Sequence, residues 1–302
     1  MSRRGWTLFL ALSLIWGVPY LLIRVAVQDL DPVVVAGLRT LIGVAVLLPI
    51  ALWRRALAPV FRRWKVLLAY TLVEITFPWW LLGMAETRLN SSTAGLMLAV
   101  VPLIAAVIVT VLGQDRLDTR RVIGLLIGFT GVAALVGLDI HVEDLKSVGF
   151  ILLTALGYAI GPIIISRSLS DLPPLGVVAG SLIVASVIYL PFVVWQFPIG
   201  TPVSAQAIWS VVGLGVLCTA VAFLVFFALI AEAGPARATV ITYINPAVAI
   251  LLGVLVLSEP FTVGTAIGFP LVIIGSILGT ARTRKAAVAP AGEPAPVVAP
   301  PS

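Results

Sequence analysis

Long apolar runs alternate with short polar breaks along most of this chain. A helix that crosses a membrane needs about 20 apolar residues, within a range of about 17–25. Ten runs have this length and composition, and we expect each to form one membrane-spanning helix. They cover residues 6–23, 33–52, 66–85, 93–112, 122–138, 148–165, 175–195, 207–230, 238–257 and 263–281. The pattern therefore predicts an all-α integral membrane protein with ten transmembrane helices.

The composition agrees with a lipid environment. Of the 302 residues, 61% are hydrophobic and 11% are charged, and the mean hydropathy is +1.16. Soluble domains carry about 25% charged residues, so these charges are too few to cover a soluble body. The net charge of +6 does not indicate a nucleic-acid partner, because the basic residues lie in short clusters between apolar runs.

The charges divide unequally between alternate polar breaks. Basic residues concentrate at the N-terminus and in every second break after it: Arg3, Arg4, Arg54, Arg55, Arg62, Arg63, Lys65, Arg116, Arg120, Arg121, Arg167, Arg237, Arg282, Arg284 and Lys285. The other breaks hold only Arg24, Arg88 and Lys146, with the acidic residues Asp29, Asp31, Glu86, Asp139, Glu143, Asp144 and Glu259. By the positive-inside rule this predicts an even number of spans, with both termini in the cytoplasm of a plasma (bacterial inner) membrane.

The ends of the chain differ in character. The basic start and apolar run of residues 1–23 resemble a signal peptide, but without a convincing cleavage site we expect a retained first helix. Residues 286–302 are rich in Pro and Ala, which predicts a disordered cytoplasmic tail.

The two halves repeat one another. An offset of 142 aligns Asp29 with Asp171, and an offset of 144 aligns Pro102 with Pro246. The further matches are Pro32 with Pro174, Pro49 with Pro191, Trp53 with Trp195, Asp115 with Glu259, Gly124 with Gly268, and Gly131 with Gly275. We therefore expect one unit in residues 1–140 and another in residues 141–285. Five helices per unit would give the units opposite orientations, an inverted repeat typical of secondary transporters with alternating access.

Several stretches resemble the EamA-type transporters of the drug/metabolite transporter superfamily. "SLIWGVPYLLIRVAV" and "DPVVVAGLRTLIGVAVLLP" are similar to the opening of that family. "STAGLMLAVVPLIAAVIVTVLGQDRL" and "ARATVITYINPAVAILLGVLVLSEPF" resemble its late-helix motif, a proline within the helix and an acidic residue after it. The resemblance covers about residues 6–281, and the departure is Gln114-Asp115-Arg116, where the family usually has Gly-Glu-Arg or Gly-Glu-Pro. It implies ten helices, cytoplasmic termini and export of small metabolites, amino acids or drugs.

Two charges lie well inside the expected spans, Arg39 and Glu74. At 1.5 Å per residue, Arg39 lies roughly 10 Å from the outer end of its span and Glu74 roughly 13 Å from the inner end of its span. The two side chains are therefore close enough in depth within the membrane to meet. One hypothesis is a structural ion pair. The other is a binding site, in which Arg39 binds a carboxylate and Glu74 binds an amine or carries a proton that drives transport.

Aromatic residues supply the other candidate binding positions. Trp16 and Tyr20 share a helix face. The remaining candidates are Trp79, Trp80, Tyr158, Phe223, Phe227 and Tyr243, with Asn245 beside the last. At a cavity these rings would suit flat, apolar or cationic substrates. The alternative is that they pack against other helices or face lipid.

Prolines and glycines within the spans predict bends and close contacts. Pro19, Pro102, Pro162 and Pro246 are candidate hinges or static kinks. Glycines in "GLLIGFTG" (residues 124–131) recur at a spacing that favours close helix packing, either within the chain or in a homodimer.

The functional hypothesis combines these patterns. The chain has one cysteine, Cys218, and one histidine, His141, so we expect no disulfide, metal site or other cofactor. The sequence contains no Walker motif for ATP. We expect a secondary transporter, an exporter of small metabolites, amino acids or lipophilic drugs, whose partners are membrane lipid and a small-molecule substrate. Coupling to a proton, coupling to another ion and transport down the substrate gradient are the three energy sources that the sequence leaves open. A channel and a membrane-embedded lipid-modifying enzyme are the alternatives, and both a monomer and a homodimer remain open.

Overall fold

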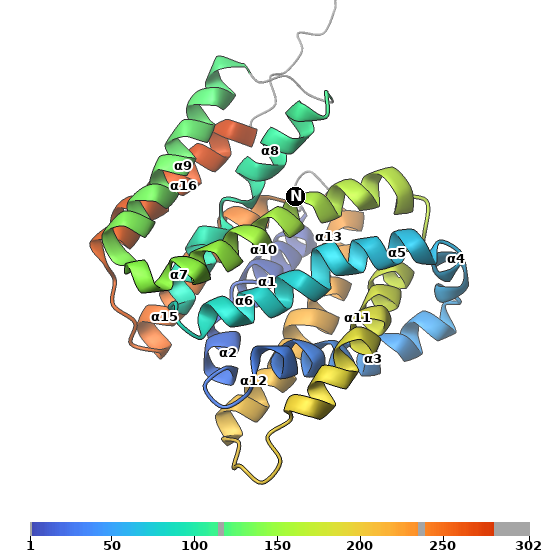
Figure 1. The fold of residues 1–302 in the computed structure, drawn as a ribbon. Helices are drawn as coiled ribbons and strands as arrows, with labels where there is room; N and C mark the ends of the chain where they lie inside the picture. Colours follow the sequence, from blue (N-terminus) through green and yellow to red (C-terminus); the bar gives the residue numbers. More distant parts are fainter. Residues whose placement is uncertain (1, 114–117, 235–238, 281–302) are drawn as a thin grey trace, which may run out of the picture.

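The computed structural model describes residues 2–113, 118–234 and 239–280. Within these ranges every regular element is a helix (Figure 1). The all-α class predicted from the sequence is confirmed. The expected tail at residues 286–302 lies outside the described residues.

The first half contains nine α-helices and one π-helical turn in its described residues. They are α1 (Arg3–Ile15), α2 (Pro19–Ala26), α3 (Pro32–Trp53), α4 (Leu57–Phe61), α5 (Trp64–Thr71), η1 (Leu72–Thr76), α6 (Phe77–Glu86), α7 (Ser91–Leu98), α8 (Val101–Val111) and α9 (Thr119–Asp139).

The second half is built in the same way. Its described elements are η2 (Val142–Asp144), α10 (Leu145–Ile164), η3 (Ile165–Leu169), α11 (Pro174–Gln196), α12 (Ala205–Gly215), η4 (Val216–Val221), α13 (Ala222–Ala233), η5 (Thr239–Tyr243), α15 (Asn245–Val256) and α16 (Val263–Thr280). Of these, η3 and η4 are π-helical, and η2 and η5 are short 3₁₀ turns.

Nine helical segments of the described chain are long and apolar enough to cross a membrane. They account for nine of the ten expected spans. The remaining one contains a shorter apolar helix, Val240–Val256, and its expected start at Ala238 lies outside the described residues. The count of ten and the opposite orientation of the two halves stay predictions.

Three of the four candidate hinge prolines begin a new helix inside an expected span. Pro19 is the first residue of α2, while Pro102 and Pro246 are the second residues of α8 and α15. Proline suits a first helical turn because its missing N–H would have no intrahelical acceptor there. Pro162 instead lies inside α10, just before the π-helical turn η3. The spans that contain the first three prolines are therefore pairs of helices.

The π-helical turns η1 and η4 occupy equivalent places in the two halves. Adding the offset of 144 to the bounds of η1, residues 72–76, gives residues 216–220, and η4 covers Val216–Val221. The same offset relates Glu74 in η1 to Cys218 in η4. Such turns interrupt α-helices most often at functional sites, so this pair directs attention to the space between them.

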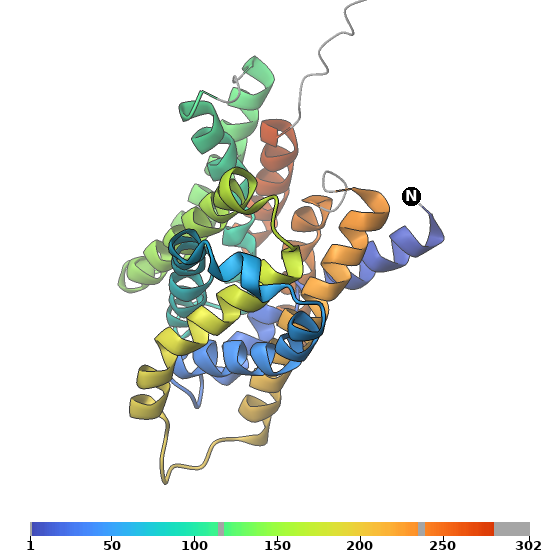
Figure 2. The ribbon, with the colours of Figure 1, turned by 90° about the vertical axis from the view of Figure 1, so that its right-hand side faces the viewer.

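Helices of the first half pack mainly against helices of the second. The most extensive contacts are those of α9 with α16, α3 with α11, α6 with α10, α7 with α15, α2 with α12 and α1 with α13 (Figures 1 and 2). These contacts join span 5 to span 10, span 2 to span 7, span 4 to span 9, span 3 to span 6 and span 1 to span 8. If each span of the first half is exchanged with its counterpart five spans later, the same set of contacts results. A two-fold relation between the halves predicts such a pattern.

The contact between α9 and α16 depends on glycine. A Cβ atom on Gly124 would lie 2.3 Å from the backbone nitrogen of Gly279, and one on Gly275 would lie 2.3 Å from that of Gly128. At one end of the pair, Arg121 Nε donates a hydrogen bond to the carbonyl oxygen of Gly279 at 3.2 Å. The glycines of residues 124–131 therefore pack within the chain.

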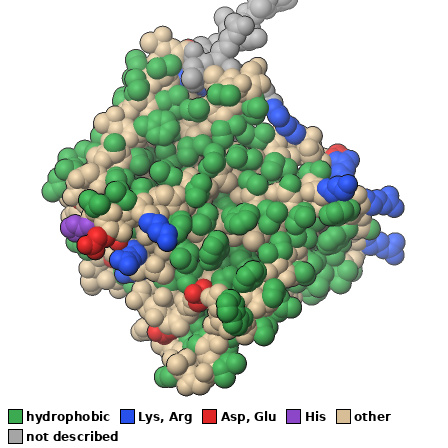
Figure 3. Space-filling model, viewed as in Figure 1, with side chains coloured by type: hydrophobic (Ala, Val, Ile, Leu, Met, Phe, Trp, Pro, Cys, Tyr) green, Lys and Arg blue, Asp and Glu red, His purple; other side chains and the backbone are tan. Residues whose placement is uncertain are grey.

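Apolar side chains cover most of the face seen in Figure 3, and basic side chains gather at the edge formed by α4. Tryptophans at the span ends are exposed, among them Trp53 and Trp195 at 81% each. Apolar surface of this extent suits lipid as the surrounding solvent.

Candidate functional site

Arg39 lies at the meeting point of three elements. Its side chain projects from α3 and is 7% exposed. The guanidinium carbon lies 3.6 Å from the ring centroid of Trp79 on α6, and Nε donates a hydrogen bond to Thr219 Oγ1 on η4 at 3.0 Å. Because Thr219 donates its own hydroxyl proton to the Leu214 carbonyl at 2.8 Å, its oxygen is free to accept from Arg39. We call Arg39, Trp79 and Thr219 the central site.

The ion pair between Arg39 and Glu74 is not formed. Arg63–Asp171 and Arg88–Asp144 are the ion pairs between described residues. Glu74 faces α10, where a Cβ atom on Gly161 would lie 1.8 Å from its Oε2. That oxygen is buried and has no hydrogen-bond partner among the described residues. The structural ion-pair hypothesis is therefore wrong, because η1 directs Glu74 toward α10 while Arg39 points to Trp79 and η4.

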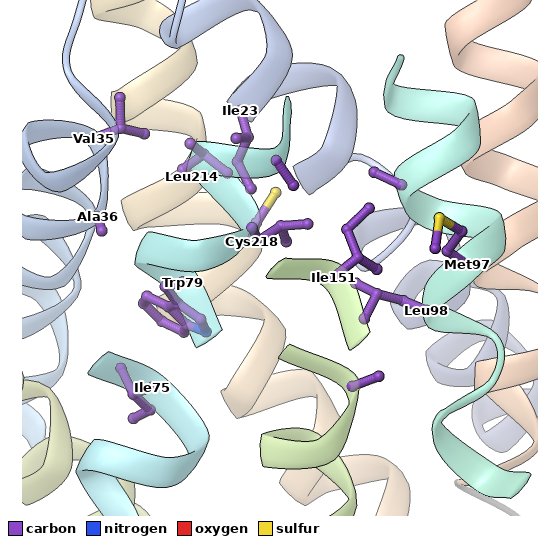
Figure 4. Close-up of a cluster of buried hydrophobic side chains, with 14 of the residues drawn as sticks. Ile23, Val35, Ala36, Ile75, Trp79, Met97, Leu98, Ile151, Leu214 and Cys218 are labelled. Atoms are coloured by element: carbon purple, nitrogen blue, oxygen red, sulfur yellow. The ribbon is translucent and has the colours of Figure 1, made fainter. Parts of the chain in front are cut away.

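Tyrosines surround the central site. Tyr20, Tyr158 and Tyr189 lie within electrostatic range of Arg39, and Tyr158 is also in range of Glu74. The Tyr189 hydroxyl donates to the backbone carbonyl of Thr76, at the end of η1. Two of the sequence candidates, Tyr20 and Tyr158, therefore lie close to Arg39. Figure 4 shows the cluster of buried apolar side chains around Trp79 and Cys218.

Another three candidates form a separate aromatic group. Trp16 follows α1, and its ring meets the edge of Phe223 on α13 with centroids 6.0 Å apart. Phe223 in turn stacks on Phe227 at 6.2 Å. These rings join α1 to α13, next to the break between α1 and α2.

The remaining candidates lie elsewhere. Trp80 is 36% exposed on the outside of α6. The Tyr243 hydroxyl lies 2.6 Å from Thr280 Oγ1 and so links η5 to α16. Asn245 begins α15, and a Cβ atom on Gly17 would lie 3.3 Å from its carbonyl oxygen. The structure does not bring these three together with Arg39.

A pocket of about 570 Å³ opens at the predicted outer side. Its lining includes Arg24, Asp29, Asn90, Ser204 and Glu259, from four of the breaks between spans. We call it the outer pocket. Asp29 Oδ2 accepts a hydrogen bond from the Ser204 backbone nitrogen at 2.9 Å, and hydrogen bonding to Ser204 lowers the pKa of the Asp29 carboxyl.

Two acidic residues near this pocket are buried, although the sequence predicts them in outer loops. Glu259 is 9% exposed and Glu86 is 0% exposed. Glu259 accepts hydrogen bonds from the backbone nitrogens of Ser91 and Ser92 at 2.8 and 3.0 Å, and from Ser92 Oγ at 2.5 Å. It thereby caps the N-terminus of α7, whose first N–H groups need acceptors from outside the helix.

Glu86 has a different environment. Arg24 donates to its backbone carbonyl, but both side-chain oxygens are buried without a hydrogen-bond partner among the described residues. Sequence reasoning missed Glu86 because it ends a span, where an acidic residue is expected to reach water.

The described residues contain no group of three or more His, Cys, Asp and Glu side chains that could hold a metal ion. The chemistry available at the central site is that of a guanidinium on an aromatic ring, with hydroxyl and carboxyl groups nearby.

Comparison with known proteins identifies the family. The EamA-like transporter family matches residues 3–137 and again residues 145–280. The chain belongs to this family. The EamA-like resemblance seen in the sequence is thereby confirmed, and two matched stretches fit the internal repeat, although the bounds of the two units stay a prediction.

Two relatives of this EamA-like protein are named as uncharacterized transporters. "Uncharacterized transporter YvbV" of Bacillus subtilis is 28% identical over 279 residues, which cover 90% of each chain. "Uncharacterized inner membrane transporter YedA" of Escherichia coli is 27% identical over 250 residues, or 80% of this chain and 79% of the relative. A solved structure titled "Crystal structure of protein" has a TM-score of 0.65 at 20% identity and covers 93% of this chain and 98% of its own. The protein is an integral membrane transporter with the fold of its family.

Proposed function

We propose that this EamA-like protein is a secondary transporter that exports small organic carboxylates, including amino acids, by alternating access. The observation that carries the proposal is the central site. Arg39 is buried, its guanidinium lies on Trp79, and it has no acidic partner within 4.0 Å among the described residues.

The chemistry of Arg39 favours a carboxylate. A guanidinium presents its N–H groups in a planar fork that pairs with both oxygens of a carboxylate. An uncompensated charge in a low-dielectric interior is unfavourable. An anionic group that enters the site would therefore complete the charge balance, and Trp79 with Tyr20 and Tyr158 would contact the apolar part of the molecule.

The position of the site supports alternating access. Arg39 belongs to the first half and Thr219 to the second, so relative movement of the halves would change the central site directly. Inverted repeats that rock about a central site are the usual basis of such transport. The outward direction is what resemblance to the exporting members of the family implies.

Transport by purified protein in proteoliposomes tests this proposal. The probes are radiolabelled neutral amino acids, benzoate as an aromatic carboxylate, and tetraphenylphosphonium as a lipophilic cation. We expect saturable uptake and exchange of at least one carboxylate, with strong loss in Arg39→Gln. Arg88→Gln is the matched control, because the Arg88 side chain is 63% exposed and lies 3.9 Å from Asp144.

The other outcomes separate the alternatives. Transport of the cation alone, unaffected by Arg39→Gln, would reject the carboxylate assignment. Flux that does not saturate and shows no exchange would indicate a channel. Covalent conversion of a lipid with no flux would indicate a membrane-embedded enzyme.

A further inference from the structure

Two carboxyl groups in the described membrane helices have side-chain oxygens that are buried and unpartnered. They are Glu74 Oε2 and both side-chain oxygens of Glu86. Both residues lie in the helical segment Trp64–Glu86, Glu74 in η1 near its middle and Glu86 at the end of α6. The described structure pairs neither of them with a cation.

The surroundings of Glu86 do not compensate an ionised carboxylate. Its charged or titratable neighbours are Arg24 and Tyr20 from α2, Arg39 from α3, Tyr158 from α10, and Glu259 from the segment before α16. Arg24 directs its hydrogen bond to the backbone carbonyl of Glu86. Glu259 carries the same charge as an ionised Glu86 and would repel it.

Burial without a partner favours the neutral form of a carboxyl group. Moving an ionised carboxylate out of water is strongly unfavourable unless it is paired and hydrogen-bonded, and such groups retain a proton instead. The Ser91 hydroxyl oxygen is likewise 0% exposed and unpartnered among the described residues. Glu86 therefore has the surroundings of a proton-binding group.

The outer pocket gives this group a route to solvent. Arg24 and Glu259 line the pocket and are also electrostatic neighbours of Glu86. Movement of α2 and of the segment before α16, which hold these two side chains, would open Glu86 to the predicted outer solution.

Tyrosines connect the two carboxyl groups. Tyr158 lies within electrostatic range of both Glu74 and Glu86, and Tyr20 lies within range of Glu86 and Tyr158. A phenol hydroxyl can both donate and accept a hydrogen bond. These two side chains would pass a proton in a conformation that brings them into hydrogen-bond contact with the carboxyl groups, whose buried oxygens have no such partner in the described structure. Glu74 also interacts with Tyr70, on the side away from Glu86.

We propose that Glu86 and Glu74 are the outer and inner proton-binding carboxyl groups of a path that couples inward proton movement to outward substrate movement. Glu74 first releases its proton to the cytoplasm. The proton held by Glu86 then passes through tyrosine hydroxyls to the Glu74 carboxylate, Glu86 takes a new proton from the outer solution, and no covalent bond to the substrate forms. The coupling rests on the proposed transport function, whereas proton binding by Glu86 does not.

Infrared spectroscopy of the reconstituted protein tests proton binding without any substrate. A protonated carboxyl group has a C=O stretching band that an ionised one lacks. At neutral pH we expect this band in the wild-type protein, a reduced band in Glu86→Gln, and an unchanged band in Glu143→Gln, which alters an exposed acidic residue. An identical band in wild type and Glu86→Gln would overturn the assignment.

Transport measurements then test coupling. The substrate is the carboxylate probe for which exchange is observed. If one proton moves per substrate molecule, a gradient of one pH unit should drive a substrate concentration ratio across the membrane of up to about tenfold. We expect Glu86→Gln to lose this accumulation while substrate exchange, which moves no net proton, continues. Glu86→Asp keeps a carboxyl group and should keep both the infrared band and the accumulation.

The outcomes separate this inference from the transport proposal. Absence of exchange in the wild-type protein for every probe would reject the transport proposal and leave the infrared result as the measure of proton binding. Exchange with accumulation that Glu86→Gln leaves unchanged would reject coupling through Glu86. Accumulation driven by a sodium gradient instead of a pH gradient would reject the proton as the coupling ion.

Discussion

Arg63 and Asp171 form a two-point ion pair between the two halves of the chain. Arg63 Nη1 and Nη2 each lie 2.7 Å from an Asp171 carboxylate oxygen, and Nη1 also donates to the Ser168 carbonyl at 2.7 Å. The offset of 142 relates Asp171 to Asp29, which accepts one hydrogen bond from the Ser204 backbone. Equivalent breaks are therefore held by a charged pair on the predicted inner side and by hydrogen bonding between Asp29 and Ser204 on the outer side, where the pocket lies.

Removing the Arg63–Asp171 pair should favour opening toward the predicted cytoplasmic side. The reporter is Cys218, the one cysteine of the chain, which is 1% exposed in η4 beside the central site. In Asp171→Asn we expect a membrane-impermeant maleimide to label Cys218 faster from the cytoplasmic side. Exposed ion pairs contribute little, so the increase should stay below about fivefold. Glu143→Gln is the control, and labelling unchanged by Asp171→Asn would contradict the role of this pair.

The same pair should depend on pH in a defined direction. The hydrogen bond from the Arg63 side chain lowers the pKa of the Asp171 carboxyl. A group whose pKa is lower in the folded state stabilises the protein above its unfolded pKa, about 3.9 for aspartate, and loses this contribution as the pH falls through the folded value. We expect the thermal stability difference between wild type and Asp171→Asn to be constant from neutral pH to about pH 5, and to vanish in stronger acid. A difference that disappeared near pH 6 would have another source.

Much of the helical framework follows from hydropathy because the membrane fixes how long an apolar helix must be. The sequence also predicts bends at Pro19, Pro102 and Pro246, since proline cannot donate to the preceding turn. Each of these residues indeed lies at the first or second position of a new helix. The π-helical turns η1 and η4 were not predictable in this way, because residues 72–76 and 216–221 contain no proline or glycine to mark them.

The candidate site was predicted only in part for a related reason. Depth along a helix placed Arg39 and Glu74 near one another, but it did not specify which neighbour each side chain would face. The burial of Glu259 depends on the N–H groups of Ser91 and Ser92, about half the chain length away in sequence. Contacts over such separations depend on tertiary packing, which local patterns do not encode.

Arg39→Lys should weaken substrate binding although it keeps the charge. A lysine ammonium lacks the planar fork that binds both carboxylate oxygens and stacks on an aromatic ring. Hydrogen bonds to charged groups contribute about 1.5–3 kcal/mol each, so loss of one should raise KM by about tenfold or more. KM for the transported carboxylate in proteoliposomes provides the measurement, with Arg88→Lys as control. An unchanged KM would show that Arg39 does not contact the substrate.

Gly124→Ala should destabilise the protein, whereas Gly137→Ala on the same helix should not. A Cβ atom at Gly124 would lie 2.3 Å from Gly279 N, while one at Gly137 meets no atom within 4 Å. Overpacking typically costs about 1–3 kcal/mol, and replacing an exposed helical glycine by alanine gains up to about 1 kcal/mol. Melting temperatures of the detergent-purified variants should move in opposite directions. Equal effects of the two variants would mean that α9 and α16 do not pack closely in the folded protein.

Glu259→Ala should loosen the start of α7 and leave the rest of the helix intact. The substitution removes the acceptor for the backbone N–H groups of Ser91 and Ser92, which are buried and close to the outer pocket. Loss of a helix cap costs about 0.5–2 kcal/mol. Since 1.4 kcal/mol corresponds to a factor of ten, these amides should exchange with deuterium up to about thirtyfold faster. Hydrogen–deuterium exchange of peptides covering residues 88–98 measures the effect, with Glu143→Ala as control. If the exchange rates at Ser91 and Ser92 did not change, Glu259 would not be their acceptor in the membrane.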